Sequence, residues 1–254
     1  MTPFPLSTSR AARLDVVATT GSTNADLRMH VDDVAGWPHL STLVSRHQSA
    51  GRGRLDRRWT APAGASLAIS VLLRHEVPPA QRGWVPLIAG TAMADAVAAQ
   101  LSAHEVAVKW PNDVLVDGRK ICGILAEAAG SAIIVGAGVN TAMTEAQLPV
   151  PTATSFAVLG APVDEDRLLA DYLRMLEQRL AALAEAGDAV AAGIHAVATA
   201  RSATIGRSVV VTLPGDRVQE GTAVSLDEEG RLIVETEGRV EAISAGDVVH
   251  ARRL

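Results

Sequence analysis

The pattern of the chain changes near Arg201, and this change constrains the fold more than any other feature of the sequence. After Arg201, short apolar segments alternate with turn sequences such as Pro214-Gly215-Asp216, Glu229-Gly230 and Glu237-Gly238. Five short strands within about 50 residues are typical of a small all-β barrel. We therefore predict two domains, at residues 1–200 and 201–254.

The longer of these two parts mixes helical and strand-like patterns. Residues 84–101 are rich in Ala and apolar throughout, which predicts a mostly buried helix, and residues 164–185 have the apolar spacing of an amphipathic helix. Only 3% of the chain is aromatic, so Val, Leu, Ile and Ala must build the core. Strands are expected at residues 14–18, 42–45, 66–73, 106–108, 114–116, 121–127 and 132–136.

The overall composition excludes several classes of protein. The net charge is −5 and the pI about 5.8, so nothing attracts the whole chain to nucleic acid or to an anionic membrane. Cys122 is the only cysteine, which excludes an internal disulfide and a multi-thiolate zinc site and favours a reducing compartment. No apolar run reaches the roughly 18 residues that a membrane span needs. We predict a soluble cytoplasmic protein.

Residues 47–64, between two predicted strands, are polar, rich in Gly and Arg, and without periodicity. Long irregular loops in compact domains are usually functional or mobile. Gly51 and Gly53 allow the backbone to approach a ligand closely. Four cations suited to a carboxylate or a phosphate follow within seven positions, namely Arg52, Arg54, Arg57 and Arg58. Neither a Walker loop nor a complete dinucleotide motif is present, and by composition alone a solvated basic loop is an equal alternative.

A second polar segment, Lys109-Trp110-Pro111-Asn112-Asp113, joins two predicted strands as an ordered corner. Asn112 could fix a nucleotide, whereas Trp110 and Pro111 are better explained as structural. Asp113 could hold Mg²⁺ or cap the turn. Lys120 begins the next strand, where a lysine alone would most often point to solvent.

Several other residues have equally simple structural explanations. Cys122 is better explained as a small buried hydrophobic residue than as a nucleophile. Ser22, Thr23 and Asn24 suit a helix N-cap, and the glycines of Gly136-Ala137-Gly138-Val139-Asn140 suit a bulge or close packing. The histidines lack the spacing of metal ligands, so no metal site is assigned.

Taken together, in order and spacing, these blocks resemble the biotin–protein ligase family. They are Ser22-Thr23-Asn24, Gln48 with Gly51-Arg52-Gly53-Arg54 and Trp59, Lys109 to Asp113, Lys120, and Gly136-x-Gly138-x-Asn140. The resemblance runs from about Leu14 to Asn140 and implies an α+β fold. Its catalytic domain would be a mixed β-sheet with helices, as in class II synthetases, followed by a small SH3-like β-barrel.

The resemblance also implies a two-step reaction. Biotin and ATP, with Mg²⁺, would form biotinyl-5′-AMP, and a lysine of a biotin carboxyl carrier domain of a carboxylase would then take the biotinyl group. Lys120 and Arg52 would be catalytic. Biotin would contact Ser22, Thr23, Asn24, Gln48, Gly51, Arg52, Arg54, Lys120, Gly136 and Gly138. The nucleotide would contact Arg54, Arg57, Trp59, Asn112 and Asn140. No ligands of Mg²⁺ are assigned.

Alternatives and departures stay open. A lipoate- or octanoyl-transferring enzyme of similar fold is the nearest alternative, and a non-catalytic sensor or a nucleic-acid-binding regulator are more distant ones. Asp56 stands where many relatives have glycine. The catalytic strand begins by about Leu14, which leaves no room for an amino-terminal DNA-binding module, so we expect no DNA binding. Monomer and homodimer are both compatible, and we expect the loop to become ordered when ligand binds.

Overall fold

The computed structural model describes residues 4–250 except 56, 76, 214, 216 and 245. Its larger sheet has seven strands in the order β1-β2-β3-β7-β6-β5-β4. The pair β1–β2 is parallel and the other neighbouring strands are antiparallel, so the predicted mixed sheet is confirmed. The strands are β1 (Arg13–Val17), β2 (Ser41–Ser45), β3 (Ser66–Leu73), β4 (Val106–Lys109), β5 (Asp113–Val116), β6 (Arg119–Ala129) and β7 (Ala132–Asn140).

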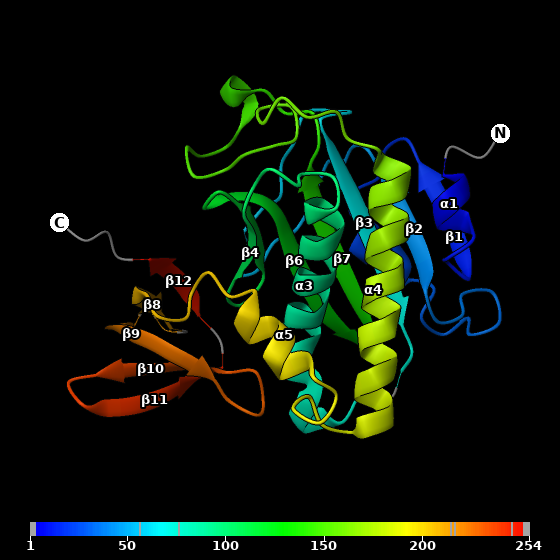
Figure 1. Cartoon of the computed structure of the whole chain (residues 1–254). Helices are drawn as coiled ribbons and strands as arrows, with labels where there is room; N and C mark the ends of the chain where they lie inside the picture. Colours follow the sequence, from blue (N-terminus) through cyan, green and yellow to red (C-terminus); the bar gives the residue numbers. More distant parts are fainter. Residues whose placement is uncertain are drawn as a thin grey trace.

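Two long helices cover one face of this sheet (Figure 1). The first is α3 (Val85–Ala98), which follows a 3₁₀ turn, η1 (Pro79–Trp84). The second is α4 (Glu165–Ala186); the side chain of Asp164 accepts a hydrogen bond from the Arg167 amide at its start, and Gly187 ends it with a φ of 69°. Both predicted helices are therefore confirmed to within a few residues at their ends.

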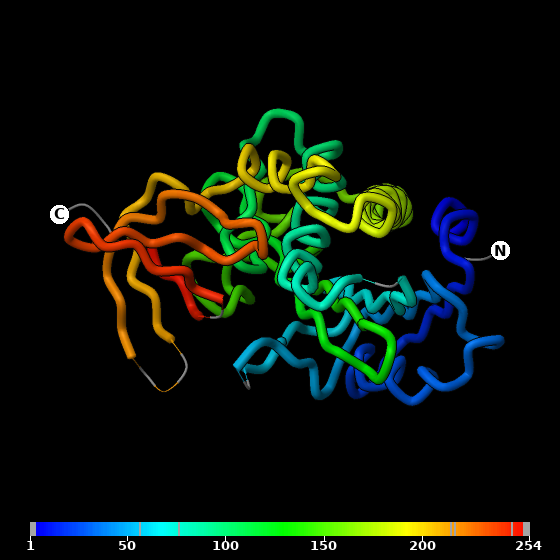
Figure 2. Tube along the Cα trace, turned by 90° about the horizontal axis from the view of Figure 1, so that it is seen from below, coloured from blue at the N-terminus to red at the C-terminus, as the bar shows by residue number. Residues whose placement is uncertain are grey.

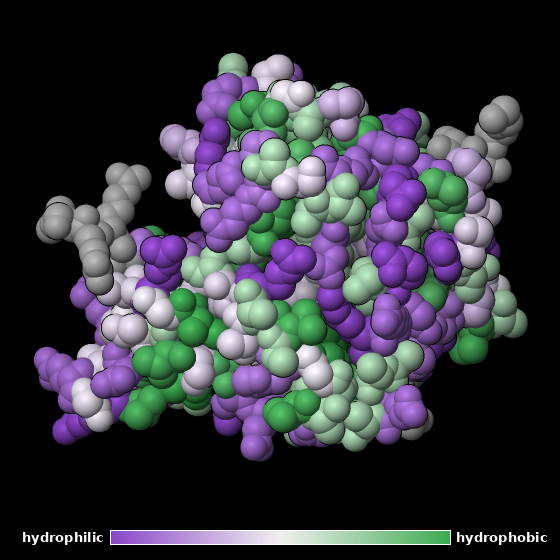
Figure 3. Space-filling view, viewed as in Figure 1, coloured by the Kyte–Doolittle hydropathy of each residue, from purple (hydrophilic) through white to green (hydrophobic). Residues whose placement is uncertain are grey.

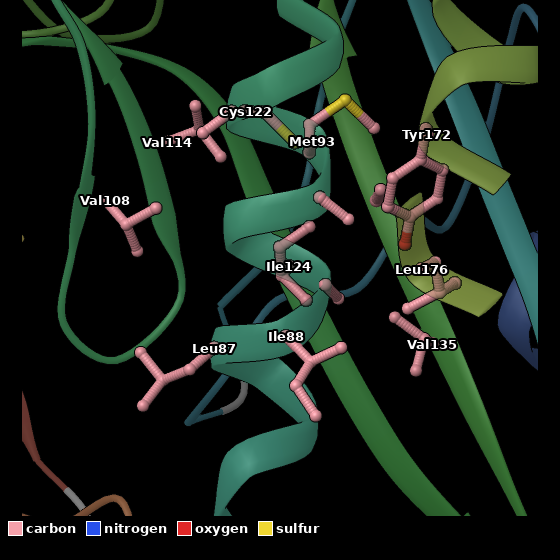
Figure 4. Packing of buried hydrophobic residues seen from close by; sticks show 14 of the residues in the cluster. Leu87, Ile88, Met93, Val108, Val114, Cys122, Ile124, Val135, Tyr172 and Leu176 are labelled. Carbon is pink, nitrogen blue, oxygen red and sulfur yellow. The ribbon is translucent and has the colours of Figure 1, made fainter. Parts of the chain in front are cut away.

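The core between these helices and the sheet is aliphatic, as the low aromatic content predicts (Figure 4). Leu87, Ile88 and Met93 of α3 and Tyr172 of the neighbouring helix α4 belong to this cluster, and all four are almost fully buried. Cys122 belongs to the same cluster, and burial raises the pKa of its thiol strongly. The thiol therefore stays neutral and acts as a core group, as expected from the sequence.

The opposite face of the sheet carries α2 (Thr23–Arg28). Ser22 caps this helix, since its Oγ accepts a hydrogen bond from the Ala25 amide. A smaller apolar cluster, including Leu27, Trp37 and Ile134, fixes α2 to the sheet. Two short helices were not predicted, α1 (Pro5–Thr8) and α5 (Ile194–Ala200).

A second sheet, antiparallel and five-stranded, lies at the end of the molecule opposite the amino terminus (Figure 2). Its strand order, β11-β10-β9-β8-β12, is consistent with the predicted SH3-like domain. The strands are β8 (Ser208–Thr212), β9 (Val218–Leu226), β10 (Leu232–Thr236), β11 (Arg239–Ile243) and β12 (Asp247–His250).

Two buried tryptophans attach the second sheet to the first. Trp110 Nε1 donates to the carbonyl of Gly230 at 3.0 Å, and Trp84 Nε1 donates to the carbonyl of Glu228 at 2.9 Å. The Trp110–Pro111 peptide bond is cis. Trp110 is 3% exposed, and its indole N–H is donated to the Gly230 carbonyl. Trp110 thus has the structural role that its sequence context favours.

Polar and apolar side chains alternate over the helix-covered surface (Figure 3). Within the described part of the chain, no helix combines the length and the apolar character needed to cross a membrane.

Candidate active site

The floor of the candidate site is a patch of β6 and β7 without side chains, on the face of the sheet opposite α3 and α4. A Cβ atom on Gly138 would lie 2.5 Å from Trp59 Cε2, and one on Gly136 would lie 2.5 Å from Asn24 Oδ1. Neither distance is possible for a real Cβ atom. These two glycines are therefore required because Trp59 and Asn24 lie directly on the backbone of the sheet.

Above this floor, the loop of residues 47–64 folds back on itself. The Gly53 amide donates to the Arg57 carbonyl at 2.7 Å, and the Trp59 amide donates to the Gly51 carbonyl at 3.0 Å. At the start of the loop, Gln48 Oε1 accepts hydrogen bonds from the amide and hydroxyl of Thr23, at 2.8 and 3.0 Å. The loop is thus joined to the start of α2. Asp56, which departs from the family pattern, lies outside the described residues.

Cations from the loop and the sheet surround a cavity of about 130 Å³ beside Trp59. Lys120 Nζ forms an ion pair with Asp113 Oδ1 at 2.6 Å. Arg54 Nη1 donates to Asn112 Oδ1 at 3.1 Å. Four positively charged side chains line this cavity, namely Arg54, Arg57, Arg58 and Lys120. Together with the indole and Gly123 of β6, they suit a ligand that carries both phosphate and an aromatic base.

The small C-terminal sheet contributes to the same cavity. Arg57 Nη2 forms an ion pair with Asp247 Oδ2 at 2.6 Å, and Arg54 Nη2 donates to the carbonyl of Gly246 at 3.2 Å. Nothing near Asp247 in the sequence predicts this contact, because the paired residues are separated by 190 positions.

A larger cavity, of about 700 Å³, lies under the first half of the loop and is lined by Arg52, Leu125 and Glu127 among others. Glu127 forms an ion pair with Arg52 at 3.0 Å. Sequence reasoning did not single out Glu127. Its position could have been inferred from strand alternation, which places it on the same face of β6 as Gly123 and Leu125.

Two of the candidate residues are buried and hydrogen-bonded to other parts of the protein, although Asn140 Oδ1 has no partner among the described residues. Asn140 lies at the end of β7, is 3% exposed and donates through Nδ2 to the carbonyl of Thr154 at 2.9 Å. It does not line either cavity. Asn24 is 4% exposed and accepts a hydrogen bond from Ser70 Oγ at 2.5 Å. Their expected contacts with nucleotide and biotin remain predictions.

A group of possible metal ligands, His39, His75 and Glu177, lies away from these cavities. His39 Nδ1 accepts the backbone N–H of Arg74 at 3.0 Å, so the ring proton is on Nε2, which lies 2.7 Å from Glu177 Oε2. A metal would need the lone pair of Nε2 and a proton on Nδ1, the reverse of this arrangement. We therefore assign no metal to this group.

Comparisons with known proteins agree with this geometry. The sequence model of the biotin/lipoate A/B protein ligase family matches residues 17–140, and that of the biotin protein ligase C-terminal domain matches residues 204–251. A biotin protein ligase from Aquifex aeolicus, solved with biotin and ATP, superposes with a TM-score of 0.77 at 25% identity and covers 95% of this chain and 100% of that one. One from Leishmania major, solved with biotinyl-5-AMP, has a TM-score of 0.61 at 28% identity and covers 92% and 99%.

The fold and the site thus define a protein ligase of the biotin and lipoate class. A biotin–[acetyl-CoA-carboxylase] ligase from Mycobacterium tuberculosis is 43% identical over 94% of this chain and 90% of its own length. The bifunctional ligase/repressor BirA of Escherichia coli is 32% identical over 92% of this chain and 72% of its own length. The chain belongs to the biotin–protein ligase family.

Proposed function

We propose that this protein is an ATP-dependent, AMP-forming biotin–protein ligase that biotinylates the carrier domain of a biotin-dependent carboxylase. The observation that carries the proposal is the cavity beside Trp59, where Arg54, Arg57 and Lys120 meet next to Gly123 of β6. The relatives and solved structures named above are biotin ligases, and two of the latter bind biotin with ATP or biotinyl-5-AMP. These matches favour biotin over the lipoate or octanoyl alternative.

The reaction needs positioned charge rather than a nucleophilic side chain. A carboxylate oxygen of biotin attacks the α-phosphorus of ATP, and the bond from this phosphorus to the bridging oxygen breaks, releasing pyrophosphate. The amine of the carrier lysine then attacks the acyl carbon of biotinyl-5′-AMP, loses a proton, and displaces AMP. Magnesium enters with ATP as part of the substrate. Negative charge develops on phosphate oxygens in the first step, where fixed cations lower the barrier most effectively.

The cations of the site suit distinct parts of this reaction. Arg52 faces the larger cavity, where it meets the biotin carboxylate and later the acyl phosphate. Lys120 lines the smaller cavity alone, whereas Arg54 and Arg57 line both cavities where they meet; these three bind phosphate oxygens, with Trp59 against the adenine. Ser22, Thr23, Gln48 and Gly51 border the biotin ring.

Thr23 supports this role because its hydroxyl is already held in place. The proton of Ser70 Oγ goes to Asn24 Oδ1, so the Thr23 hydroxyl has two acceptors, Ser70 Oγ at 2.7 Å and Gln48 Oε1 at 3.0 Å. A ureido ring presents donors and an acceptor in one plane, so it requires polar partners of fixed direction. A fatty acyl chain requires none.

The division into a catalytic domain at residues 1–200 and an SH3-like domain at residues 201–254 belongs to this proposal. The second sheet supplies Asp247 and the Gly246 carbonyl to the arginines of the loop, which supports a contribution to the nucleotide end of the site. A cytoplasmic location, the absence of DNA binding and the choice between a monomer and a homodimer remain predictions.

An incorporation assay tests the function. The protein is incubated with biotin, ATP, Mg²⁺ and an apo carrier domain, and the mass of the carrier is measured. We expect one biotinyl group per carrier, dependent on ATP, and no labelling of a carrier whose acceptor lysine is replaced by arginine. A carrier that stays unlabelled with biotin but is labelled with lipoate would contradict the proposal.

A further inference from the structure

Glu127 of β6 joins the loop to helix α2. Its Oε2 accepts a hydrogen bond from Asn24 Nδ2 at 2.7 Å and another from Arg52 Nη2 at 3.0 Å. Its Oε1 lies 3.5 Å from Arg28 Nη2. Asn24 and Arg28 belong to α2 and Arg52 belongs to the loop, so one carboxylate holds groups from both.

Two of these three partners are fixed in place by other contacts. Asn24 is buried against Gly136, and its Oδ1 accepts the Ser70 hydroxyl. Arg28 Nη1 donates to the carbonyl of Ala128, next to Glu127 itself, at 3.0 Å.

Arg52 is held less firmly than these two partners. Its side chain is about as exposed as that of Arg28, 43% against 42%, but among the described residues its side chain donates to Glu127 alone. Both Arg52 and Glu127 line the cavity of about 700 Å³. Arg52 is therefore the partner that can leave Glu127 without disturbing the rest of the contact.

We propose that Glu127 is a positioning residue that holds Arg52 over this cavity until the carboxylate of the substrate takes its place. The inference rests on the proposed function, in which Arg52 meets the carboxylate of biotin. Binding then exchanges one carboxylate for another on the same guanidinium. Glu127 keeps Asn24 and Arg28 after the exchange, so its negative charge is not left unpaired.

The exchange is possible because the pair is weak. Ion pairs with this degree of exposure contribute little net free energy, and a substrate carboxylate offers Arg52 the same interaction. Breaking the Arg52–Glu127 pair thus lowers the apparent affinity for biotin only slightly. A ligand without a carboxylate does not replace Glu127 and bears no such cost.

Comparison of biotin with biotin alcohol, in which a primary alcohol replaces the carboxyl group, isolates this cost. Calorimetry without ATP gives the dissociation constants of both ligands, and their ratio cancels effects that are common to the two. In Glu127→Gln the ratio of the biotin alcohol constant to the biotin constant should rise about two- to fivefold. In Arg28→Gln it should fall, because Glu127 then depends more on Arg52.

Glu165→Gln is the matched control. Glu165 also pairs with an arginine, Arg46, and its side chain is 17% exposed against 20% for Glu127. In Glu165→Gln, the ratio of the biotin alcohol constant to the biotin constant should equal that of the unmodified protein.

A second control separates the exchange from a direct effect of charge through space. In an Arg52→Ala background, neither Glu127→Gln nor Arg28→Gln should change the ratio. An unchanged ratio in the two single variants, or a change that persists without Arg52, would overturn the inference. If one of these results is found and the unmodified protein still transfers biotin to the carrier, the exchange is wrong but the proposed function stands. If the unmodified protein binds no biotin, the proposed function is contradicted as well.

Discussion

At the scale of single residues, three cations of the site are held by acids of the same protein. Lys120 pairs with Asp113 at 2.6 Å, Arg57 with Asp247 at 2.6 Å and Arg52 with Glu127 at 3.0 Å. The pairs of Lys120 and Arg57 fix the direction of a cation before substrate arrives, which lowers the reorganisation needed in the reaction. A site of this kind works by placing charge, and this explains why Cys122 can be an inert part of the core.

Replacing Lys120 with alanine tests this interpretation. Lys120 lies in the cavity proposed for the phosphates, so its loss should slow adenylate formation by about 10²- to 10³-fold, the usual effect of losing one well-placed donor. Biotin affinity should change by much less. Single-turnover release of pyrophosphate gives the rate, and calorimetry with biotin alone gives the affinity.

Asp113→Asn is the control for Lys120, because it breaks the same ion pair and keeps the ammonium group. It should slow adenylate formation less than Lys120→Ala does. Equal losses in the two variants would show that the ion pair, rather than positive charge at the phosphate, is what the reaction requires.

At the scale of elements, the site is made where the loop, α2 and two strands meet. The loop leaves β2 and returns to β3, yet it lies over β6 and β7, which come more than 50 residues later in the chain. This is possible because β7 pairs with β3, which brings the glycine floor beside the ends of the loop. The order of the strands thus assembles residues that no local pattern connects.

This order also limits what the sequence could predict. The strand at residues 66–73 has a strong apolar bias, and the helix at residues 164–185 has strong periodicity. Both are therefore predicted almost to the residue. The short helices α1 and α5 were missed because they depend on distant contacts, such as that of Ser7 with Asp166. The pairing of Glu127 with Arg52, and of Asp247 with Arg57, was missed because it depends on topology. The resemblance to a family supplied the rest of the candidate site.

Limited digestion with trypsin tests how the loop responds to ligand. Arg52, Arg57 and Arg58 of the loop are exposed, and the loop lies outside the helices and strands, so trypsin should cut there in the ligand-free protein. Biotin with ATP should slow this cleavage strongly, because biotinyl-5′-AMP replaces water beneath the loop. Equal cleavage with and without both ligands would refute ordering of the loop. ATP alone and biotin alone serve as controls.

At the scale of the whole molecule, the C-terminal sheet is attached to the catalytic sheet on two levels. The buried indoles of Trp84 and Trp110 anchor it at the β9–β10 turn. Asp247 and Gly246, at the start of β12, contact the arginines of the loop. The first contact is buried, whereas in the second the side chain of Arg57 is 61% exposed and that of Asp247 33% exposed. We therefore expect the second contact to be the weaker of the two.

Asp247→Asn tests the second contact. Burial raises the pKa of Asp247, but the hydrogen bond from Arg57 and the charges of Arg57, Lys109 and Arg54 lower it more, so its pKa lies below the ordinary value. The aspartate is thus charged at neutral pH. It stabilises the pair fully above the ordinary pKa of an aspartate, and this contribution is lost as the pH falls through the lowered pKa.

Loss of this pair should release the loop in the ligand-free protein. Because Arg57 is 61% exposed, the interaction is weak, and tryptic cleavage of the loop should rise only about two- to fivefold at neutral pH. The difference between Asp247→Asn and the unmodified protein should stay constant down to weakly acidic pH, since Asp247 remains charged there. Glu241→Gln, on the exposed strand β11, removes a charge from the same sheet without touching the loop and should leave cleavage unchanged. Equal cleavage of Asp247→Asn and Glu241→Gln would mean that Trp84 and Trp110 attach the second sheet on their own and that the loop moves independently of it.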